Sequence, residues 1–101
     1  MAFFIKTEII KKEYLRDFDT KREVIQSHIN WVIDLKSQGF NIKSGFLVDN
    51  LKRPGGGGFL ILESNSYADA IKILKNDPMI THDLVNWEIH QWIDVIEKDN
   101  F

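Results

Sequence analysis

The pattern of hydrophobic and polar positions predicts alternating strands and helices along the chain. Residues 2–8, AFFIKTE, are rich in aromatic and branched side chains and predict a first strand. A polar connection over residues 11–19 separates it from a helix that we expect to begin at Thr20. Thr20 and Glu23 match a capping box, in which each side chain satisfies a free backbone amide. We expect the helix to end at Gly39, because glycine readily takes the left-handed conformation that ends many helices.

The second half of the chain continues the same alternation. Residues 40–49 and 59–64 predict two strands, and the sequence LKRPGGGG between them predicts a break. Ser66 is a cap residue for a second helix, whose apolar positions follow the spacing of one helical face: Tyr67, Ala70, Ile71 and Leu74. Pro78 prevents simple continuation of that helix and leaves room for one short helical turn. Residues 85–95 then predict the last strand.

This order of elements, βαββαβ, predicts an α+β fold of the ferredoxin-like type, in one domain over residues 1–101. In that fold a four-stranded antiparallel sheet carries both helices on one face. The other face would be too apolar to lie in water, since Phe3 and Ile5 alternate with Phe4, and Trp92 alternates with Trp87. Exposed apolar patches of this kind mark interfaces. We therefore predict a homodimer in which two sheets pack face to face as a dimeric α+β barrel.

Composition narrows the classes of function. Apolar residues make up 44% of the chain and the formal charge is −2, with acidic and basic residues mixed. No basic surface for nucleic acid or for an anionic membrane is therefore expected. The chain has no cysteine, which excludes disulfides and thiolate chemistry. No apolar run approaches the roughly 20 residues of a membrane span. We expect a cytoplasmic protein that needs no cofactor or metal.

One titratable side chain lies on the apolar side of the first predicted helix. At 100° per residue the apolar residues form a single arc, and His28 falls near its centre. The members of that arc are Val24, Ile25, Ile29, Trp31, Val32 and Leu35. Such a histidine is either a neutral core residue or a general base, and a base near neutral pH needs a carboxylate beside it.

Asp77, in the sequence NDPMI, is the candidate for that carboxylate. An aspartate before proline is commonly a turn former or a helix cap, so it has an alternative role. Both helices are expected to lie side by side on the sheet, however, and the direction of the Asp77 side chain decides between that role and a contact with His28. A carboxylate on one ring nitrogen fixes the tautomer and stabilises the charged ring, as in a hydrolase but without the nucleophile.

Several short motifs together resemble one known family. The segments SHINWVIDLKSQG, SG at 44–45, GGGGFLILES, DPMI and VNWEIHQW occur in the order typical of YCII-related (YciI-like) domains, over nearly the whole chain. The resemblance implies a ferredoxin-like fold that dimerises, with a functional histidine and aspartate that correspond to His28 and Asp77. Many relatives carry an arginine where this chain has Ile25, so a guanidinium site for anionic substrates is not implied.

Other residues were weighed as parts of a site. A minority of the aromatic side chains is expected to line an apolar pocket, and the candidate lining residues are Trp31, Gly45, Phe46, Phe59, His90 and Trp92. The glycines at 55–58 do not match a phosphate-binding loop, because they lead into a strand rather than a helix. They predict a mobile hairpin. Ser27 cannot act with His28, because neighbours on a helix point about 100° apart.

Two functions are compatible with these observations. In the first, the protein is a small cofactor-free enzyme in which His28, oriented by Asp77, moves a proton in an isomerisation or elimination of a small cyclic or aromatic molecule. In the second, it is a dimeric module that binds a small ligand, and His28 and Asp77 are a structural pair. The two differ in whether the pair lies where a ligand can reach it.

Overall fold

The computed structural model describes residues 1–96 and has the predicted order of main elements. A 3-10 turn, η1, and a short third helix, α3, join them. The elements in chain order are β1 (Ala2–Ile10), η1 (Lys12–Tyr14), α1 (Phe18–Ser37), β2 (Ile42–Val48), β3 (Pro54–Ser64), α2 (Tyr67–Leu74), α3 (Pro78–Thr81) and β4 (Val85–Trp92).

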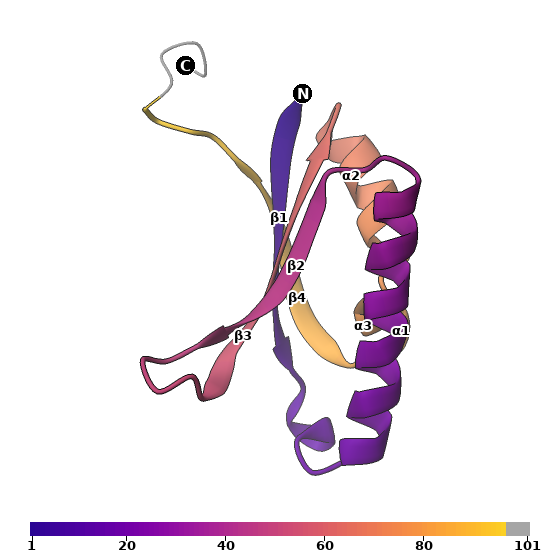
Figure 1. Ribbon diagram of the computed structural model, residues 1–101, viewed down its shortest axis with the longest axis vertical. Helices are drawn as coiled ribbons and strands as arrows, with labels where there is room; N and C mark the ends of the chain where they lie inside the picture. Colours follow the sequence, from indigo (N-terminus) through magenta and orange to yellow (C-terminus); the bar gives the residue numbers. More distant parts are fainter. Residues whose placement is uncertain (97–101) are drawn as a thin grey trace.

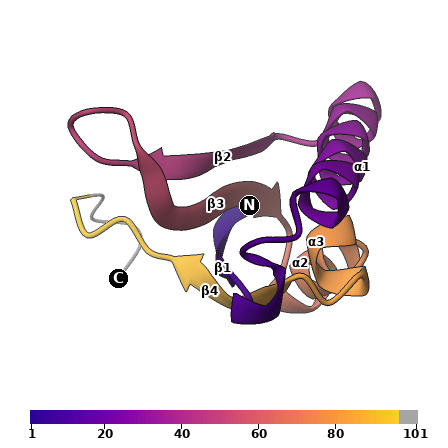
Figure 2. The ribbon, with the colours of Figure 1, turned by 90° about the horizontal axis from the view of Figure 1, so that it is seen from below.

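The four strands form one antiparallel sheet in the order β2-β3-β1-β4. The helices α1, α2 and α3 all lie on one face of this sheet (Figures 1 and 2). This confirms the predicted α+β, ferredoxin-like fold. Because β2 and β4 are the edge strands, the two central strands carry the residues that are enclosed most completely between the sheet and the helices.

The first helix begins before the predicted cap. Asp17 is the N-cap, and its carboxylate accepts a hydrogen bond from the backbone N–H of Thr20 at 3.1 Å. The expectation of a cap at Thr20 was therefore wrong, because an aspartate three residues earlier is an equally good acceptor and adds a turn to the helix. At the other end, Gly39 has φ of 95°, as its predicted role after the helix requires.

The glycine-rich segment belongs to β3 and is not the predicted break. The chain turns over residues 49–53, and the strand then begins at Pro54. Gly57 has φ of 86°, and a Cβ there would lie 2.3 Å from the backbone oxygen of Glu8. The glycines therefore let this part of β3 pass very close to β1, which no other residue type would allow.

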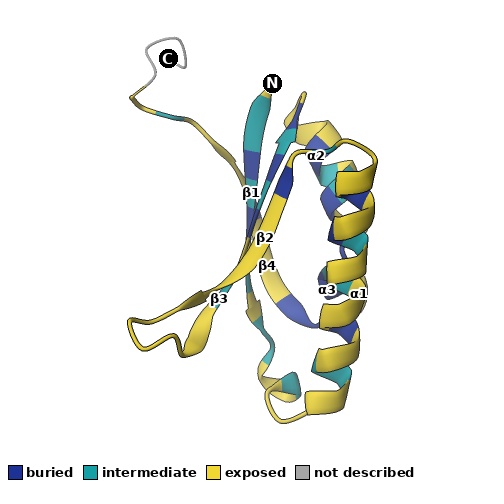
Figure 3. Cartoon of the chain, viewed as in Figure 1, coloured by how far each residue is buried: buried dark blue, intermediate teal, exposed yellow. Residues whose placement is uncertain are grey.

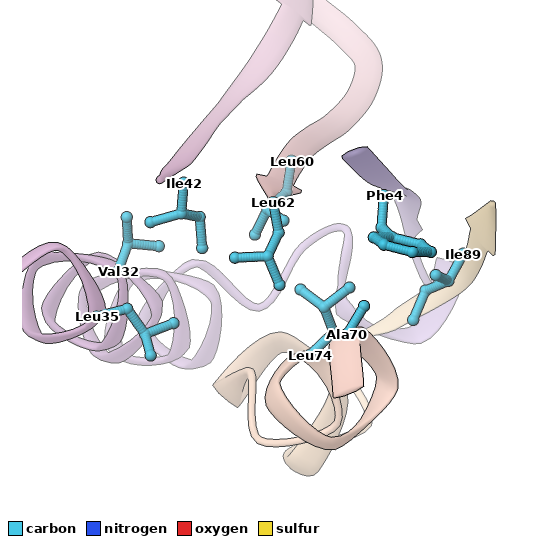
Figure 4. Close-up of a cluster of buried hydrophobic side chains, with 9 residues drawn as sticks. All are labelled: Phe4, Val32, Leu35, Ile42, Leu60, Leu62, Ala70, Leu74 and Ile89. Atoms are coloured by element: carbon cyan, nitrogen blue, oxygen red, sulfur yellow. The ribbon is translucent and has the colours of Figure 1, made fainter. Parts of the chain in front are cut away.

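The hydrophobic core lies between the sheet and the helices. Figure 4 shows its main cluster, in which side chains from α1 and α2 meet side chains from all four strands. Its buried members are Phe4, Val32, Leu35, Ile42, Leu60, Leu62, Ala70, Leu74 and Ile89. A smaller cluster of Val24, Met79, Leu84 and Val85 packs beside it, below the junction of α1 and α3. Figure 3 shows the buried residues on the strands and on the helices that pack against them, whereas the turn between β2 and β3 is exposed.

The face of the sheet away from the helices is open and partly apolar. The registers place Phe3 beside Trp92, and Thr7 beside Phe59, on this face. Trp92 is 49% exposed and Phe59 is 36% exposed. We call this surface the outer face. Within residues 1–96 no helix is long and apolar enough to cross a membrane.

Candidate active site

His28 lies on the buried stripe of α1. Val24 precedes it by one turn and Val32 follows it by one turn, and both are buried. The stripe therefore carries the imidazole toward the sheet, and only 12% of the His28 side chain is exposed. The ring thus occupies the place on the apolar side of the helix that the sequence predicts.

Asp77 is the N-cap of the short helix α3, which follows α2 after a gap of three residues. Its Oδ1 accepts a hydrogen bond from the backbone N–H of Met79 at 2.9 Å, and the residue is completely buried. Pro78 occupies the first position of α3, where a missing N–H costs nothing. The capping role considered for Asp77 is thus real, and it also holds the carboxylate rigidly in the interior.

The same carboxylate reaches the imidazole. Asp77 Oδ1 lies 2.7 Å from His28 Nδ1, and Ser44 Oγ lies 2.7 Å from His28 Nε2 on the opposite side of the ring. An ionised carboxylate can only accept, so His28 Nδ1 carries the proton and donates it to Asp77. In the neutral ring Nε2 is then an acceptor. The ring is a candidate base that faces Ser44 and the exterior.

Two further charged side chains extend this arrangement into the sheet. Lys6 on β1 is 1% exposed, and its Nζ makes ion pairs with Asp77 Oδ2 and with Glu8 Oε1. Sequence reasoning missed this lysine. The signal was present, however, because the alternation of β1 places Lys6 between Phe4 and Glu8 on the helix-facing side, where a lysine must have a charged partner.

The carboxylate of Glu8 owes its position to a glycine on the neighbouring strand. Glu8 pairs with Gly58 in the sheet, and a Cβ at position 58 would lie 2.7 Å from Glu8 Cγ. Because Gly58 has no side chain, Glu8 can fold over the strand toward Lys6. One of the four glycines thus shapes the site through its lack of a side chain.

The charges of the site keep Asp77 ionised. Burial by itself raises the pKa of the Asp77 carboxyl, but the hydrogen bond from His28 and the positive charge of Lys6 outweigh it. The pKa of Asp77 therefore lies below its ordinary value. Asp77 therefore places a negative charge directly beside the His28 ring.

The other predicted pocket residues are divided between the two faces of the sheet. The ring of Trp31 lies 5.8 Å from that of His28, and Phe46 lies on the helix-facing side, two residues beyond Ser44. The remaining four lie on the outer face, opposite the site, because their strand positions have the other parity: Gly45, Phe59, His90 and Trp92. The structure does not bring these four together with His28 and Asp77.

Two hollows open on the surface near the sheet. One, of about 540 Å³, lies at the far end of α1 around Gly39 and Asn65. The other, of about 410 Å³, is lined by Glu8, Gly58 and Trp87 among others and adjoins the site through Glu8. His28 lines neither of these two, so a pocket directly beside its ring remains a prediction. Within residues 1–96 no group of three potential metal ligands converges.

Comparison with known proteins identifies a shared fold. No family model matches the sequence, and no curated protein matches it. Among solved structures, 5-chloro-2-hydroxyhydroquinone dehydrochlorinase (TftG) from Burkholderia phenoliruptrix AC1100, in complex with 2,5-dihydroxybenzoquinone, is similar with a TM-score of 0.62 and 19% identity. The match covers 89% of this chain and 92% of that chain. The de novo designed protein Foldit4 is matched with a TM-score of 0.45 and 9% identity. The fold of an enzyme that acts on a small molecule is thus shared, at an identity that establishes the fold alone.

Proposed function

We propose that this protein is an enzyme that acts on a small molecule. In this proposal His28 is the general base, and Asp77 orients its ring. The observation that carries the proposal is the contact of 2.7 Å between His28 Nδ1 and Asp77 Oδ1, with Nε2 on the other side of the ring in contact with the exposed Ser44. A ring held in one tautomer, with a buried carboxylate behind it, gains a proton at Nε2 with little reorganisation.

The surroundings of the ring favour proton transfer over a purely structural role. A structural pair would be satisfied by Asp77 alone, yet the second ring nitrogen points to Ser44, which is exposed. Nε2 is therefore joined to an exposed residue, whereas Nδ1 faces a buried one. Trp31, beside the imidazole, supplies an apolar surface on which a flat ring could lie.

The reaction type is an elimination or an isomerisation. In an elimination Nε2 removes a proton from an O–H or an activated C–H of the substrate, the bond from carbon to the leaving group, such as chloride, breaks, and the ring then releases the proton to solvent. In an isomerisation the ring returns the proton to the substrate at a different atom. TftG, which shares the fold, is a dehydrochlorinase whose substrate is a chlorinated hydroxyhydroquinone. We infer that this chain accepts a small hydroxylated ring of the same chemical class, and the reaction needs no group beyond those of the chain.

The test is turnover of hydroxylated and chlorinated hydroquinones, beginning with 5-chloro-2-hydroxyhydroquinone, followed by absorbance and by chloride release. Wild-type protein should convert at least one compound, and His28→Gln should slow it by about a hundredfold or more, the usual contribution of a general base. His82→Gln is the matched control, since this histidine is exposed and the hydrogen-bond partners of its ring are the Thr81 hydroxyl and the carbonyl oxygen of Pro78. Equal rates in wild type and His28→Gln would refute the proposal. Saturable binding without turnover would favour the ligand-binding alternative.

We also propose that the protein forms a homodimer through the outer face. This surface is apolar at positions from three adjacent strands, with Phe3 and Ile5 on β1, Phe59 and Ile61 on β3, and Trp92 on β4. A twofold axis through such a face brings the same side chains of two copies together, which is how most soluble homodimers are built. A second copy is therefore the occupant that we propose.

Light scattering coupled to size-exclusion chromatography tests the dimer. We expect twice the monomer mass for wild type and the monomer mass for Trp92→Lys, because a lysine buried in the proposed interface leaves an unpaired charge. Ile33→Lys is the control, since Ile33 is 60% exposed on α1 and faces away from the sheet. A monomeric wild type at micromolar concentration would exclude this interface.

A further inference from the structure

The structure places a hydroxyl where a hydrolase has its nucleophile. Ser44 on β2, His28 on α1 and Asp77 before α3 form one chain of hydrogen bonds, with 2.7 Å at each of its two contacts. We propose that Ser44 is a nucleophile activated by His28, and that the site transfers acyl groups from small activated esters. This inference rests on the proposed role of His28 as a base and adds a covalent step to it.

The direction of each hydrogen bond suits this role. Because Asp77 accepts from Nδ1–H, the other nitrogen of the neutral ring has a free electron pair. Ser44 therefore donates its O–H to Nε2, which is the arrangement that draws the proton from a serine as its oxygen attacks. Ser44 lies on β2, His28 on α1 and Asp77 just before α3. Tertiary packing therefore brings the three residues together, and local sequence does not.

Burial decreases along the three residues, from Asp77 through His28 to Ser44. Asp77 is completely buried, the side chain of His28 is 12% exposed, and Ser44 lies on the surface of an edge strand. The charged orienting group is thus shielded from water, while the attacking oxygen is open to a substrate. Lys6 holds the second carboxylate oxygen of Asp77, so this carboxylate cannot rotate away from the ring.

The register of the sheet also offers a donor for the charge that develops on the substrate. Glu63 N donates to Asn41 O at 3.0 Å, so these two residues form a hydrogen-bonded pair across β2 and β3. Ladder pairs alternate along antiparallel strands, and Ser44 opposite Leu60 is therefore a pair without backbone hydrogen bonds. The N–H of Ser44 points away from β3, at the open edge of the sheet. The amide of the nucleophile itself commonly serves an oxyanion in serine hydrolases.

The proposed reaction uses the side chains of Ser44 and His28 together with one water molecule. Ser44 Oγ forms a bond to the acyl carbon while its proton moves to His28 Nε2. The bond between the acyl carbon and the leaving oxygen breaks, and His28 returns the proton to that oxygen. A water molecule, deprotonated by the same Nε2, then releases the acid and restores the Ser44 hydroxyl.

A fluorophosphonate probe tests the nucleophile directly. With diisopropyl fluorophosphate, Ser44 Oγ would bond to phosphorus, fluoride would leave, and the proton would pass through His28 to solvent. We expect peptide mapping by mass spectrometry to find the adduct on Ser44 and no adduct in Ser44→Ala. In His28→Gln the labelling rate should fall by about a hundredfold or more. Ser27→Ala is the matched control and should label as wild type does, because Ser27 is exposed and the partners of the two ring nitrogens are Asp77 and Ser44.

Either of two labelling results would overturn the inference. The first is an adduct spread over surface lysines and tyrosines, with Ser44 unmodified while the protein is folded by circular dichroism. The second is labelling of Ser44 at the same rate in wild type and in His28→Gln. If Ser44 is not labelled while turnover of a hydroquinone still depends on His28, the proposed function stands and this inference fails. Folded wild-type protein that shows neither labelling of Ser44 nor turnover of a hydroquinone would refute both proposals.

Discussion

Glu8 lies directly over Gly58 on the neighbouring strand, so closely that a Cβ on the glycine would be 2.7 Å from Glu8 Cγ and 2.9 Å from Glu8 Cδ. This close approach brings the Glu8 carboxylate to the Nζ of Lys6, which in turn holds Asp77. Gly58, which has no side chain, thus leaves room for Glu8 to pair with Lys6. Lys6 also pairs with Asp77, the residue that orients His28.

Gly58→Ala should displace Glu8 and weaken the site. The added methyl group cannot fit beside Glu8 without moving it, and overpacking of this kind costs about 1 to 3 kcal/mol of unfolding free energy. Gly45→Ala is the matched control, because a Cβ at that position meets no atom within 4 Å. Urea unfolding of the two variants measures the difference. Equal unfolding free energies would show that Glu8 is not held over Gly58.

Lys6→Met should destabilise the protein strongly. The change leaves Asp77 and Glu8 as two carboxylates without their shared cation, and removal of one partner from a buried ion pair costs about 3 to 5 kcal/mol. The double variant Lys6→Met with Glu8→Gln should recover part of this loss, since it removes one of the stranded charges. Lys72→Met, on the exposed side of α2, should stay within about 0.5 kcal/mol of wild type. A mild effect of Lys6→Met in urea unfolding would contradict the ion-pair network.

His28→Ala should lower the free energy of unfolding by a limited amount and should also remove most of the turnover. Asp77 keeps the backbone N–H of Met79 and the ammonium of Lys6, so it is not left without partners. The loss of one hydrogen bond to a charged group amounts to about 1.5 to 3 kcal/mol. Urea unfolding and the hydroquinone assay on the same preparation separate the two effects. A fully active His28→Ala protein would assign the ring to structure alone.

Stability should fall in acid because of Asp77. Its pKa is lower in the folded protein than in the unfolded chain, since the partners His28 and Lys6 outweigh the effect of burial. The unfolded state therefore binds more protons, and the contribution of Asp77 is complete above about pH 4 and is lost as the pH falls through the folded pKa. Urea unfolding from pH 6 to pH 2 should show this slope. The double variant Lys6→Met with Asp77→Asn should have a shallower slope in this range.

Much of the fold could be predicted from local patterns. The strand and helix order, the face of α1 that carries His28 and the short turn of helix after Pro78 all follow from the period of apolar positions and from the residues that begin or end helices. The errors lie where local signals compete. Asp17 and Thr20 are both suitable caps, and the glycines at 55–58 resemble a loop until β1 is known to lie against them.

The candidate site was predictable only in part. Sequence reasoning selected His28 and Asp77, but it excluded a serine after considering only Ser27, the neighbour of the histidine in the chain. Ser44 became a candidate once β2 was seen beside α1, with its hydroxyl 2.7 Å from Nε2. Gly45, Phe59, His90 and Trp92 were grouped with the site, although strand parity turns them toward the outer face.

The sequence by itself determined which residues alternate, which helix face is apolar and which side chains can titrate, because these properties depend on neighbours within about one helical turn or two strand positions. Only the tertiary structure decided that Lys6, Asp77, His28 and Ser44 lie in one line of contacts. These residues are separated by up to 71 positions, and their distances are set by strand register and by the packing of α1 and α3 on the sheet. No local rule encodes such distances.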